Sequence, residues 1–256
     1  MSSPHQIVVE NADAVAHAAL HMFIAAAQKA IADHGSFSVA LSGGSTPRAL
    51  YRLLAKGPPT EPKEWPFDWS NVYIFFGDER CVPPDHADSN YRMANEELLS
   101  KVSSPPQNVF RMRGEIDPQE AAKEYGQTLK QRFGDGGLDL IFLGMGADGH
   151  TASLFPRSLA LKEPKHRCVA HFVEHSTTGQ SWRITLTAPF INRSAEVLIL
   201  VDGPAKAAVL KEVLDGPHHP ERLPIQMIHP VGQLVWIIDE AAYAQKALTP
   251  PHSKTS

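Results

Sequence analysis

The sequence predicts an α/β protein built on a doubly wound, mostly parallel sheet. Short runs such as residues 72–76 and 140–143 are apolar throughout, which is typical of strands buried on both faces. These runs alternate along the chain with segments of helical periodicity, and this alternation predicts parallel strands joined by right-handed crossovers. No repeat or linker divides the sequence, so we expect one α/β domain over residues 1–248 and a disordered tail over residues 249–256.

The expected strands, in chain order, cover residues 6–10, 37–41, 72–76, 140–143, 168–173, 182–187, 196–201 and 234–238. The expected helices cover residues 12–34, 48–55, 90–101, 118–133, 151–155, 188–193, 204–214 and 240–248. Asn11 can cap the first, Ala-rich helix and Gly35 can end it. Ser89 can cap a later helix, and Asp117 can do the same for the helix that begins with Pro118.

Composition narrows the classes of protein to consider. The chain has 256 residues, 43% of them hydrophobic and 20% charged, with a formal net charge of -4, whereas nucleic-acid-binding domains are normally basic. No apolar run approaches the roughly 20 residues of a membrane span, and the N-terminus lacks the order of a signal peptide. Cys81 and Cys168 are far apart and show neither a disulfide framework nor a zinc-ligand spacing. We therefore expect a reduced, cytoplasmic protein without a metal, a nucleic-acid partner or a membrane partner; its oligomeric state stays open.

Four of the expected strands end in polar segments that contain glycine. They run into SGGST after Leu41, GDER after Phe76, GMGADGH after Leu143 and DGPAK after Val201. The carboxyl ends of parallel strands lie at one edge of a sheet, where open α/β proteins bind their ligands. We therefore expect the four segments to converge on one site.

The GMGADGH segment carries a candidate catalytic pair, Asp148 and His150. Its glycines allow a sharp turn, and the following residues 151–155 are expected to form a short helix. A histidine at a helix start feels the positive end of the helix dipole, which favours the neutral ring. A neutral ring beside a carboxylate is a candidate general base. The alternative is a glycine-rich turn with an exposed histidine.

The SGGST segment is a candidate anion site. It consists of Ser42, Gly43, Gly44, Ser45 and Thr46. Glycine N–H groups and hydroxyls before a helix can cradle a phosphate group. The segment lacks the GK[ST] ending of a nucleotide P-loop and the spacing of a dinucleotide-binding loop. A plain turn with a serine cap is the alternative.

Cations stand at two other strand ends and in a later strand. Arg80 can hold a carboxylate or phosphate oxygen through its planar guanidinium. Its neighbours Asp78 and Glu79 could form a metal site, act as a base or be internal partners of Arg80, and for Glu79 we expect the pairing with Arg80. Lys206 at a helix start opposes the dipole, which points to an anionic partner, a surface ion pair being the alternative. Arg183 lies near the start of an expected strand.

Together these motifs resemble the 6-phosphogluconolactonase family, which is related in fold to the glucosamine-6-phosphate deaminases. The resemblance runs from about residue 41 to residue 236 and rests on LSGGSTP, FFGDERCVPPDHADSNY, LIFLGMGADGHTASLFP, WRITLT and LVDGPAKAAVL. It implies a modified Rossmann-like fold and no required cofactor. It also implies hydrolysis of 6-phospho-D-glucono-1,5-lactone to 6-phospho-D-gluconate in the oxidative pentose phosphate pathway.

The resemblance further implies roles for individual residues. His150 would activate the water that attacks the lactone carbonyl, Asp148 would orient His150, and Arg80 would lie near the developing oxyanion. The implied sugar-phosphate site consists of Gly43, Gly44, Ser45, Arg183 and Lys206, to which we add Ser42, Thr46 and Asp78 as substrate-binding candidates.

Two alternatives remain to be weighed. A deaminase of this fold would carry a Glu five residues after the motif histidine, where this chain has Phe155, and an aromatic residue in place of Arg80. Asp78 matches the deaminase's proton-shuttling Asp, so that alternative is weakened rather than excluded. A sugar-phosphate sensor without catalysis could dispense with Asp148 and His150, which this chain retains.

Overall fold

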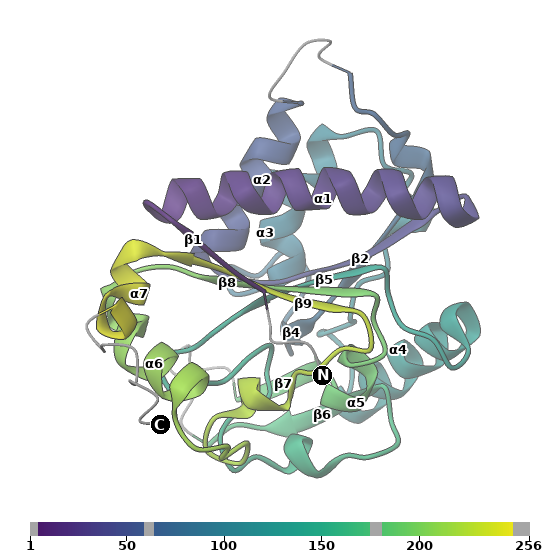
Figure 1. Ribbon diagram of the computed structural model, residues 1–256. Helices are drawn as coiled ribbons and strands as arrows, with labels where there is room; N and C mark the ends of the chain where they lie inside the picture. Colours follow the sequence, from purple (N-terminus) through teal and green to yellow (C-terminus); the bar gives the residue numbers. More distant parts are fainter. Residues whose placement is uncertain (1–4, 59–63, 175–180, 248–256) are drawn as a thin grey trace.

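In the computed structural model, which describes residues 5–58, 64–174 and 181–247, a six-stranded parallel sheet lies at the middle of the molecule (Figure 1). The strand order is β1 (His5–Val9), β9 (Gln233–Asp239), β8 (Glu196–Val201), β5 (Leu140–Gly144), β2 (Phe37–Leu41) and β3 (Val72–Phe76). From the β2–β5 pair, β3 extends the sheet in one direction and β8 and β9 extend it in the other. The carboxyl ends of β2 and β5 therefore form a topological switch point. The predicted doubly wound parallel sheet is confirmed.

Helices cover both faces of this sheet (Figure 1). One face carries α1 (Ala12–His34), α2 (Ser45–Lys56) and α3 (Asn90–Glu97). The other carries α4 (Pro118–Phe133), α5 (Ala188–Ile191), α6 (Ala207–Asp215) and α7 (Glu240–Ala247). The chain also contains short 3-10 helices: η1 (Trp69–Asn71), η2 (Leu99–Lys101), η3 (Pro106–Asn108), η4 (Leu159–Lys162), η5 (Pro204–Lys206) and η6 (Pro224–Met227). Phe142 packs in the core of the first face, whereas Ile141 and Leu143 pack in the second, so β5 is buried on both sides.

Helix α1 has the caps that the sequence predicts. The side chain of Asn11 accepts a hydrogen bond from the backbone N–H of Ala14 at 3.0 Å, and Gly35 ends the helix with a φ of 83°. By length and composition α1 is apolar enough to cross a membrane, which corrects the expectation that no apolar segment of that length exists. Leu20 and Phe23 of this helix are buried against the sheet, as in the core helix of a globular protein.

A second, three-stranded antiparallel sheet contains β4 (Asp78–Arg80), β7 (Trp182–Leu186) and β6 (Cys168–Phe172), in that order. The GDER segment, expected as a polar segment after a strand, therefore contains a short strand itself. Gly77 connects the two sheets, because its N–H donates to the carbonyl of Leu41 at 2.8 Å and its carbonyl accepts from the N–H of Leu186 at 2.9 Å. This sheet lies on the same side of the parallel sheet as α4–α7 (Figure 1).

The expected helix over residues 151–155 is wrong. Thr151 and Leu154 form an isolated β-bridge, and the N–H of Leu154 donates to the carbonyl of Thr151 at 2.9 Å. Between them Ala152 has a φ of 46°, in the left-handed region that a right-handed helix cannot include. His150 consequently does not stand at a helix N-terminus, and the dipole argument for its neutral ring no longer holds.

Other boundaries differ by smaller amounts. Helix α2 begins at Ser45, three residues before the expected start, and the helix expected over residues 204–214 is divided into η5 and α6. The helix expected over residues 90–101 is likewise divided into α3 and η2. The expected tail, residues 249–256, lies outside the described residues.

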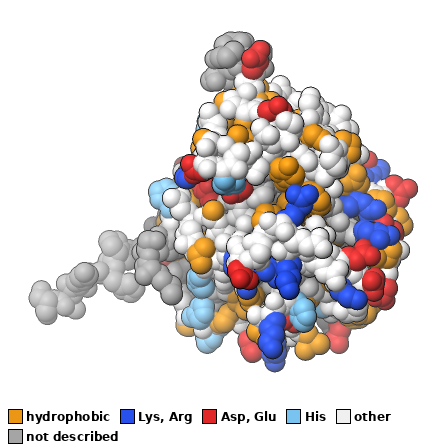
Figure 2. Space-filling model, turned by 90° about the vertical axis from the view of Figure 1, so that its right-hand side faces the viewer, with side chains coloured by type: hydrophobic (Ala, Val, Ile, Leu, Met, Phe, Trp, Pro, Cys, Tyr) orange, Lys and Arg blue, Asp and Glu red, His pale blue; other side chains and the backbone are white. Residues whose placement is uncertain are grey.

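On the face drawn in Figure 2, Lys and Arg side chains are interspersed with Asp and Glu.

Candidate active site

A cleft of about 260 Å³ lies at the carboxyl ends of β2, β5 and β8. All four polar strand-end segments contribute to its lining, as their positions at one edge of the sheet predict. The candidate site residues that line it are Ser42, Gly43, Gly44, Ser45, Thr46, Asp78, Arg80, His150 and Lys206. Two candidates lie elsewhere: Asp148 borders a larger adjoining groove, and Arg183 lies on β7 beside Arg80.

Asp148 and His150 form a hydrogen-bonded pair. Nδ1 of His150 lies 2.6 Å from Oδ1 of Asp148, and the same oxygen accepts from the backbone N–H of His150 at 3.1 Å. Partial burial raises the pKa of Asp148, but the hydrogen bonds and charge of His150 outweigh it, so the pKa lies below its usual value. An ionised Asp148 places the ring proton on Nδ1 and leaves the lone pair of Nε2 to accept a proton.

Two further residues fix the His150 ring. The ring of Phe155 packs on it, with 4.5 Å between the centroids and an angle of 32° between the planes. On another side lies Gly146, where a Cβ would stand 2.0 Å from Nδ1 of His150 and 2.6 Å from Oδ1 of Asp148. Only glycine leaves room for the pair at this position. The sequence motif contains both residues, but the contact of Phe155 with the ring depends on the turn at residues 151–154.

The candidate anion loop, residues 42–46, is held at its start by Tyr51. The Tyr51 hydroxyl accepts from the N–H of Ser42 at 2.9 Å and donates to the carbonyl of Ser42 at 2.8 Å. Ser45 and Thr46 begin α2, so their N–H groups have no acceptor within the helix. The Thr46 hydroxyl donates to the carboxylate of Asp202, which ties this loop to the segment after β8. The loop is therefore anchored at both ends and presents helix N-terminal amides at the cleft.

Lys206 also lines the cleft and lies directly before α6. Among the described residues it forms no ion pair with a carboxylate, so the surface ion pair that was its alternative explanation is not seen there. The carboxylate of Asp239 accepts from the N–H of Gly203 at 3.0 and 3.1 Å and so fixes the segment that carries Lys206. A cation held at the cleft next to a helix start suits an anionic ligand.

Asp78 is 8% exposed and lines the cleft from β4. Its Oδ1 accepts from Nδ2 of Asn90 at 3.1 Å, and its Oδ2 accepts from the hydroxyl of Ser153 at 2.6 Å. Asn90 itself lines the cleft beneath Gly43, where a Cβ would stand 2.1 Å from Oδ1 of Asn90. The sequence did not indicate this position for Asn90, because its contact with Asp78 joins residues 12 positions apart.

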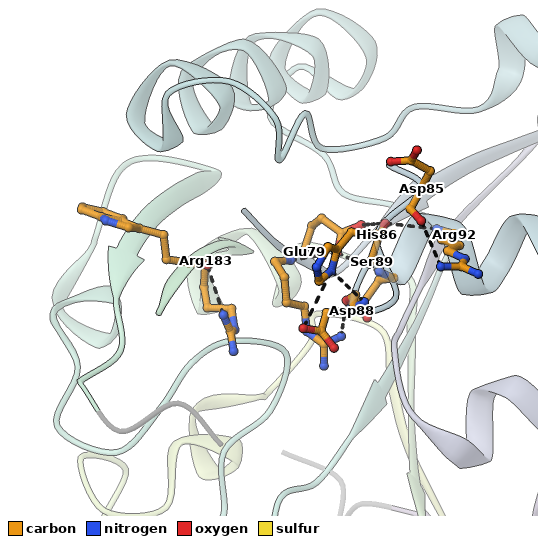
Figure 3. A network of polar contacts seen from close by, with 10 residues as sticks. Glu79, Asp85, His86, Asp88, Ser89, Arg92 and Arg183 are labelled. Carbon is orange, nitrogen blue, oxygen red and sulfur yellow. Dashed lines mark hydrogen bonds and ion pairs between the residues drawn. The ribbon is translucent and has the colours of Figure 1, made fainter. Parts of the chain in front are cut away.

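Glu79 is bonded internally, as expected, but to the backbone N–H of Arg80 and other groups rather than to the Arg80 guanidinium. Its carboxylate accepts from the backbone N–H groups of Arg80, Asn90 and Tyr91, each at 2.8 Å, and from the hydroxyl of Ser89 at 3.0 Å. Figure 3 shows Glu79 beside Ser89 within this network. Burial raises the pKa of Glu79, and the hydrogen bonds offset this only in part. Among the described residues, no group of three His, Cys, Asp or Glu side chains is placed to hold a metal ion.

Two arginines adjoin the cleft on neighbouring strands. The guanidinium of Arg80 donates to the carbonyl of Asp88 at 2.6 Å rather than to Glu79, and the residue lines the cleft. Arg183 is paired with Arg80 in the β4–β7 register and is 4% exposed. Burial, followed by the positive charge of Arg80, lowers the pKa of Arg183, while the charge of Asp78 opposes this shift. Arg80 therefore brings a positive charge to the cleft lining next to Asp78, with Arg183 on the neighbouring strand.

Cys81 follows Arg80 directly, and its thiol is expected to be unreactive. Burial raises the pKa of Cys81 to about 11, so the thiolate is scarce at neutral pH. We expect alkylation of native Cys81 by iodoacetamide at pH 7.5 to be at least about 100-fold slower than in the unfolded chain. Mass spectrometry of the labelled peptides measures both rates. Rapid labelling of the folded protein would contradict the prediction.

Comparisons with known proteins agree on one family. A family model described as "Glucosamine-6-phosphate isomerases/6-phosphogluconolactonase" matches residues 10–236, which include every segment that lines the cleft. A 6-phosphogluconolactonase of Synechocystis sp. is 39% identical over 220 residues, covering 84% of this chain and 86% of that protein. A probable chloroplastic 6-phosphogluconolactonase 3 of Oryza sativa subsp. indica is 40% identical over 227 residues, covering 84% and 67%. The solved 6-phosphogluconolactonase from Trypanosoma brucei is 27% identical, with a TM-score of 0.81 over 97% of this chain and 100% of that one.

Proposed function

The chain belongs to the glucosamine-6-phosphate isomerase/6-phosphogluconolactonase family, and we propose that within it the protein is a 6-phosphogluconolactonase. It hydrolyses 6-phospho-D-glucono-1,5-lactone to 6-phospho-D-gluconate, a reaction of the oxidative pentose phosphate pathway. The observation that carries this function is that one cleft is lined by His150, which is paired with Asp148, and by a helix N-terminal anion loop. Lactonases that are 39–40% identical over 84% of the chain support it.

In the proposed mechanism His150 is the general base. Its Nε2 takes a proton from water while the water oxygen forms a bond to the lactone carbonyl carbon. The ring bond between that carbon and the lactone oxygen then breaks, and the protonated His150 returns the proton to the leaving oxygen. Asp148 holds Nδ1–H and stabilises the positive ring between these steps. Arg80, which lines the cleft, would stabilise the negative oxygen that develops on the carbonyl.

The phosphate of the substrate would lie between the loop of residues 42–46 and Lys206. The loop offers backbone N–H groups, and Lys206 offers a charge that no carboxylate among the described residues neutralises. Arg183 would add positive potential from behind Arg80. Asp78 would accept hydrogen bonds from sugar hydroxyls, since its carboxylate lines the cleft. Binding through the remote phosphate helps to position the reacting carbonyl.

The deaminase alternative lacks a group that its chemistry requires. Phe155 stands where a deaminase of this fold would carry a Glu, and its ring packs on His150 instead of relaying a proton. Assays with 6-phosphogluconolactone and with glucosamine 6-phosphate, run on the same preparation, separate the two functions. Turnover of the amino sugar phosphate without lactone hydrolysis would overturn the proposed function.

The phosphate site predicts the effect of removing Lys206. We expect Lys206→Ala to raise the Kd for 6-phosphogluconate by about 10- to 100-fold, because one charged contact to the phosphate is lost. Arg183→Ala is expected to weaken binding in the same direction. Lys211→Ala is the matched control, since Lys211 lies on the adjoining helix α6 but does not line the cleft. Calorimetric titration measures the three values, and an unchanged Kd for Lys206→Ala would remove it from the site.

For the location of the protein we propose the cytoplasm, as a reducing compartment. Both Cys81 and Cys168 are free thiols, which suits such a compartment. The rice relative is named chloroplastic, so members of the family occupy more than one compartment. Microscopy of the tagged protein in its own cell tests this proposal.

A further inference from the structure

Ser153 joins the loop that carries His150 to all three strands of the second sheet. It is 1% exposed and lies within the turn formed by Thr151 and Leu154. Its hydroxyl donates to Oδ2 of Asp78 on β4 at 2.6 Å. Its N–H donates to the hydroxyl of Thr185 on β7 at 3.2 Å, and its carbonyl lies 2.6 Å from Nε2 of His171 on β6. Every polar group of this residue is therefore committed to a different strand.

The contact with His171 is a fixed donor–acceptor bond. A carbonyl oxygen can only accept, so Nε2 of His171 carries the proton. Burial, with the positive charge of Arg183 in addition, lowers the pKa of His171, which favours the neutral ring. Its Nδ1 is buried and has no hydrogen-bond partner among the described residues. His171 thus secures the backbone of Ser153; it is 6% exposed and borders the larger groove rather than the cleft.

The hydroxyl of Ser153 has a separate consequence, because it acts on a residue of the cleft. Asp78 has one anchor on each carboxylate oxygen, Asn90 on Oδ1 and Ser153 on Oδ2. A carboxylate bonded on both oxygens is fixed in its rotation. Without Ser153, only the bond from Asn90 would hold the orientation of this group.

We propose that Ser153 is a positioning residue that orients the Asp78 carboxylate toward the sugar hydroxyls of the bound substrate. The inference rests on the proposed function, in which Asp78 contacts the sugar. His171 and Thr185 contribute by holding the Ser153 backbone, and neither reaches the substrate itself. The second sheet therefore holds both the loop of His150 and the carboxylate of Asp78 in position.

Ser153→Ala isolates this role. The substitution removes the hydroxyl but keeps the backbone bonds to His171 and Thr185, so the loop stays docked. We expect the Kd for 6-phosphogluconate to rise about tenfold, the scale of one hydrogen bond to a charged group. The Kd for inorganic phosphate is expected to stay within about twofold, because the phosphate loop is untouched. Calorimetric titration with both ligands gives the ratio of the two Kd values. A general loss of structure would raise both Kd values and leave this ratio unchanged.

Two further variants complete the test. Ser194→Ala is the matched control, since Ser194 is a fully buried serine whose hydroxyl accepts from the N–H of Leu138, remote from the cleft lining. It is expected to change neither Kd. In an Asp78→Ala background, Ser153→Ala is expected to add no further loss, because Ser153 acts through Asp78. If Ser153→Ala does not fold, Ser153→Cys keeps the volume with a weaker donor and is expected to show the same selective loss.

The outcomes are distinct. An unchanged Kd for 6-phosphogluconate in the folded variant overturns the inference, and so does an equal loss for both ligands or an additive loss in the Asp78→Ala background. A wild-type protein that binds phosphate but neither binds 6-phosphogluconate nor hydrolyses the lactone overturns the proposed function. The inference then falls with it, and that result is separate from any behaviour of the Ser153 variants.

Discussion

Replacing His150 with alanine is expected to lower kcat for lactone hydrolysis by about 10²- to 10⁴-fold, the usual contribution of general acid–base catalysis. The methyl group of alanine can neither accept the proton of the attacking water nor return it to the leaving oxygen. The Kd for 6-phosphogluconate is expected to change by less than about threefold, because the phosphate loop and Lys206 keep their positions. A loss in kcat without a loss in affinity distinguishes a catalytic group from a binding group.

The assay compares hydrolysis with the spontaneous background for the wild type and His150→Ala in parallel. His166→Ala serves as the control, since His166 is an exposed histidine paired with Glu163 and does not line the cleft. It is expected to retain wild-type turnover. Unchanged turnover in His150→Ala would remove His150 as the base. No acceleration by the folded wild type would overturn the lactonase function itself.

Gly146→Ala is expected to lower kcat almost as much, by about 10²-fold or more, although residue 146 has no functional group. Its Cβ would stand 2.0 Å from Nδ1 of His150 and 2.6 Å from Oδ1 of Asp148, which are impossible contacts. The His150 ring and the Asp148 carboxylate must therefore separate, and the bond that fixes the ring proton on Nδ1 is lost. The proton-accepting Nε2 is then no longer held in position.

Gly126→Ala is the matched control for this prediction. A Cβ at Gly126 would have no heavy atom closer than 3.9 Å, and the residue lies on α4, outside the cleft lining. We expect wild-type kcat in this variant and a melting temperature close to that of the wild type in both. Full activity in Gly146→Ala would show that catalysis does not require the close pair of Asp148 and His150.

The sequence predicted the parallel sheet because its signals are local. Each core strand is a continuous apolar run, and a strand buried on both faces needs no information from distant residues to be recognised. The convergence of the four strand-end segments followed from topology alone, since parallel strands place their carboxyl ends at one edge. The residues that line the cleft from these segments, such as His150 and Lys206, could therefore be named before the structure was known.

The errors arose where distant contacts decide the local structure. Residues 151–155 have a composition that allows a helix, but Ser153 is held by three strands of another sheet and Ala152 adopts a left-handed conformation. No spacing in the sequence indicates that Asp78 and Ser153 meet across 75 positions. Phe155 was recognised only as a residue that cannot relay a proton, and its packing on His150 depends on the same turn.

The three bonds of Ser153 also bear on the order in which the molecule assembles and comes apart. They join residues 18, 32 and 75 positions apart, so the loop can acquire its shape only after β4, β6 and β7 have come together. On its other face the parallel sheet has an apolar core with α1, α2 and α3, to which neither this loop nor the smaller sheet contributes. In mild denaturant, activity is therefore expected to disappear before the parallel strands lose their protection from hydrogen exchange, as a sub-global opening of the smaller sheet.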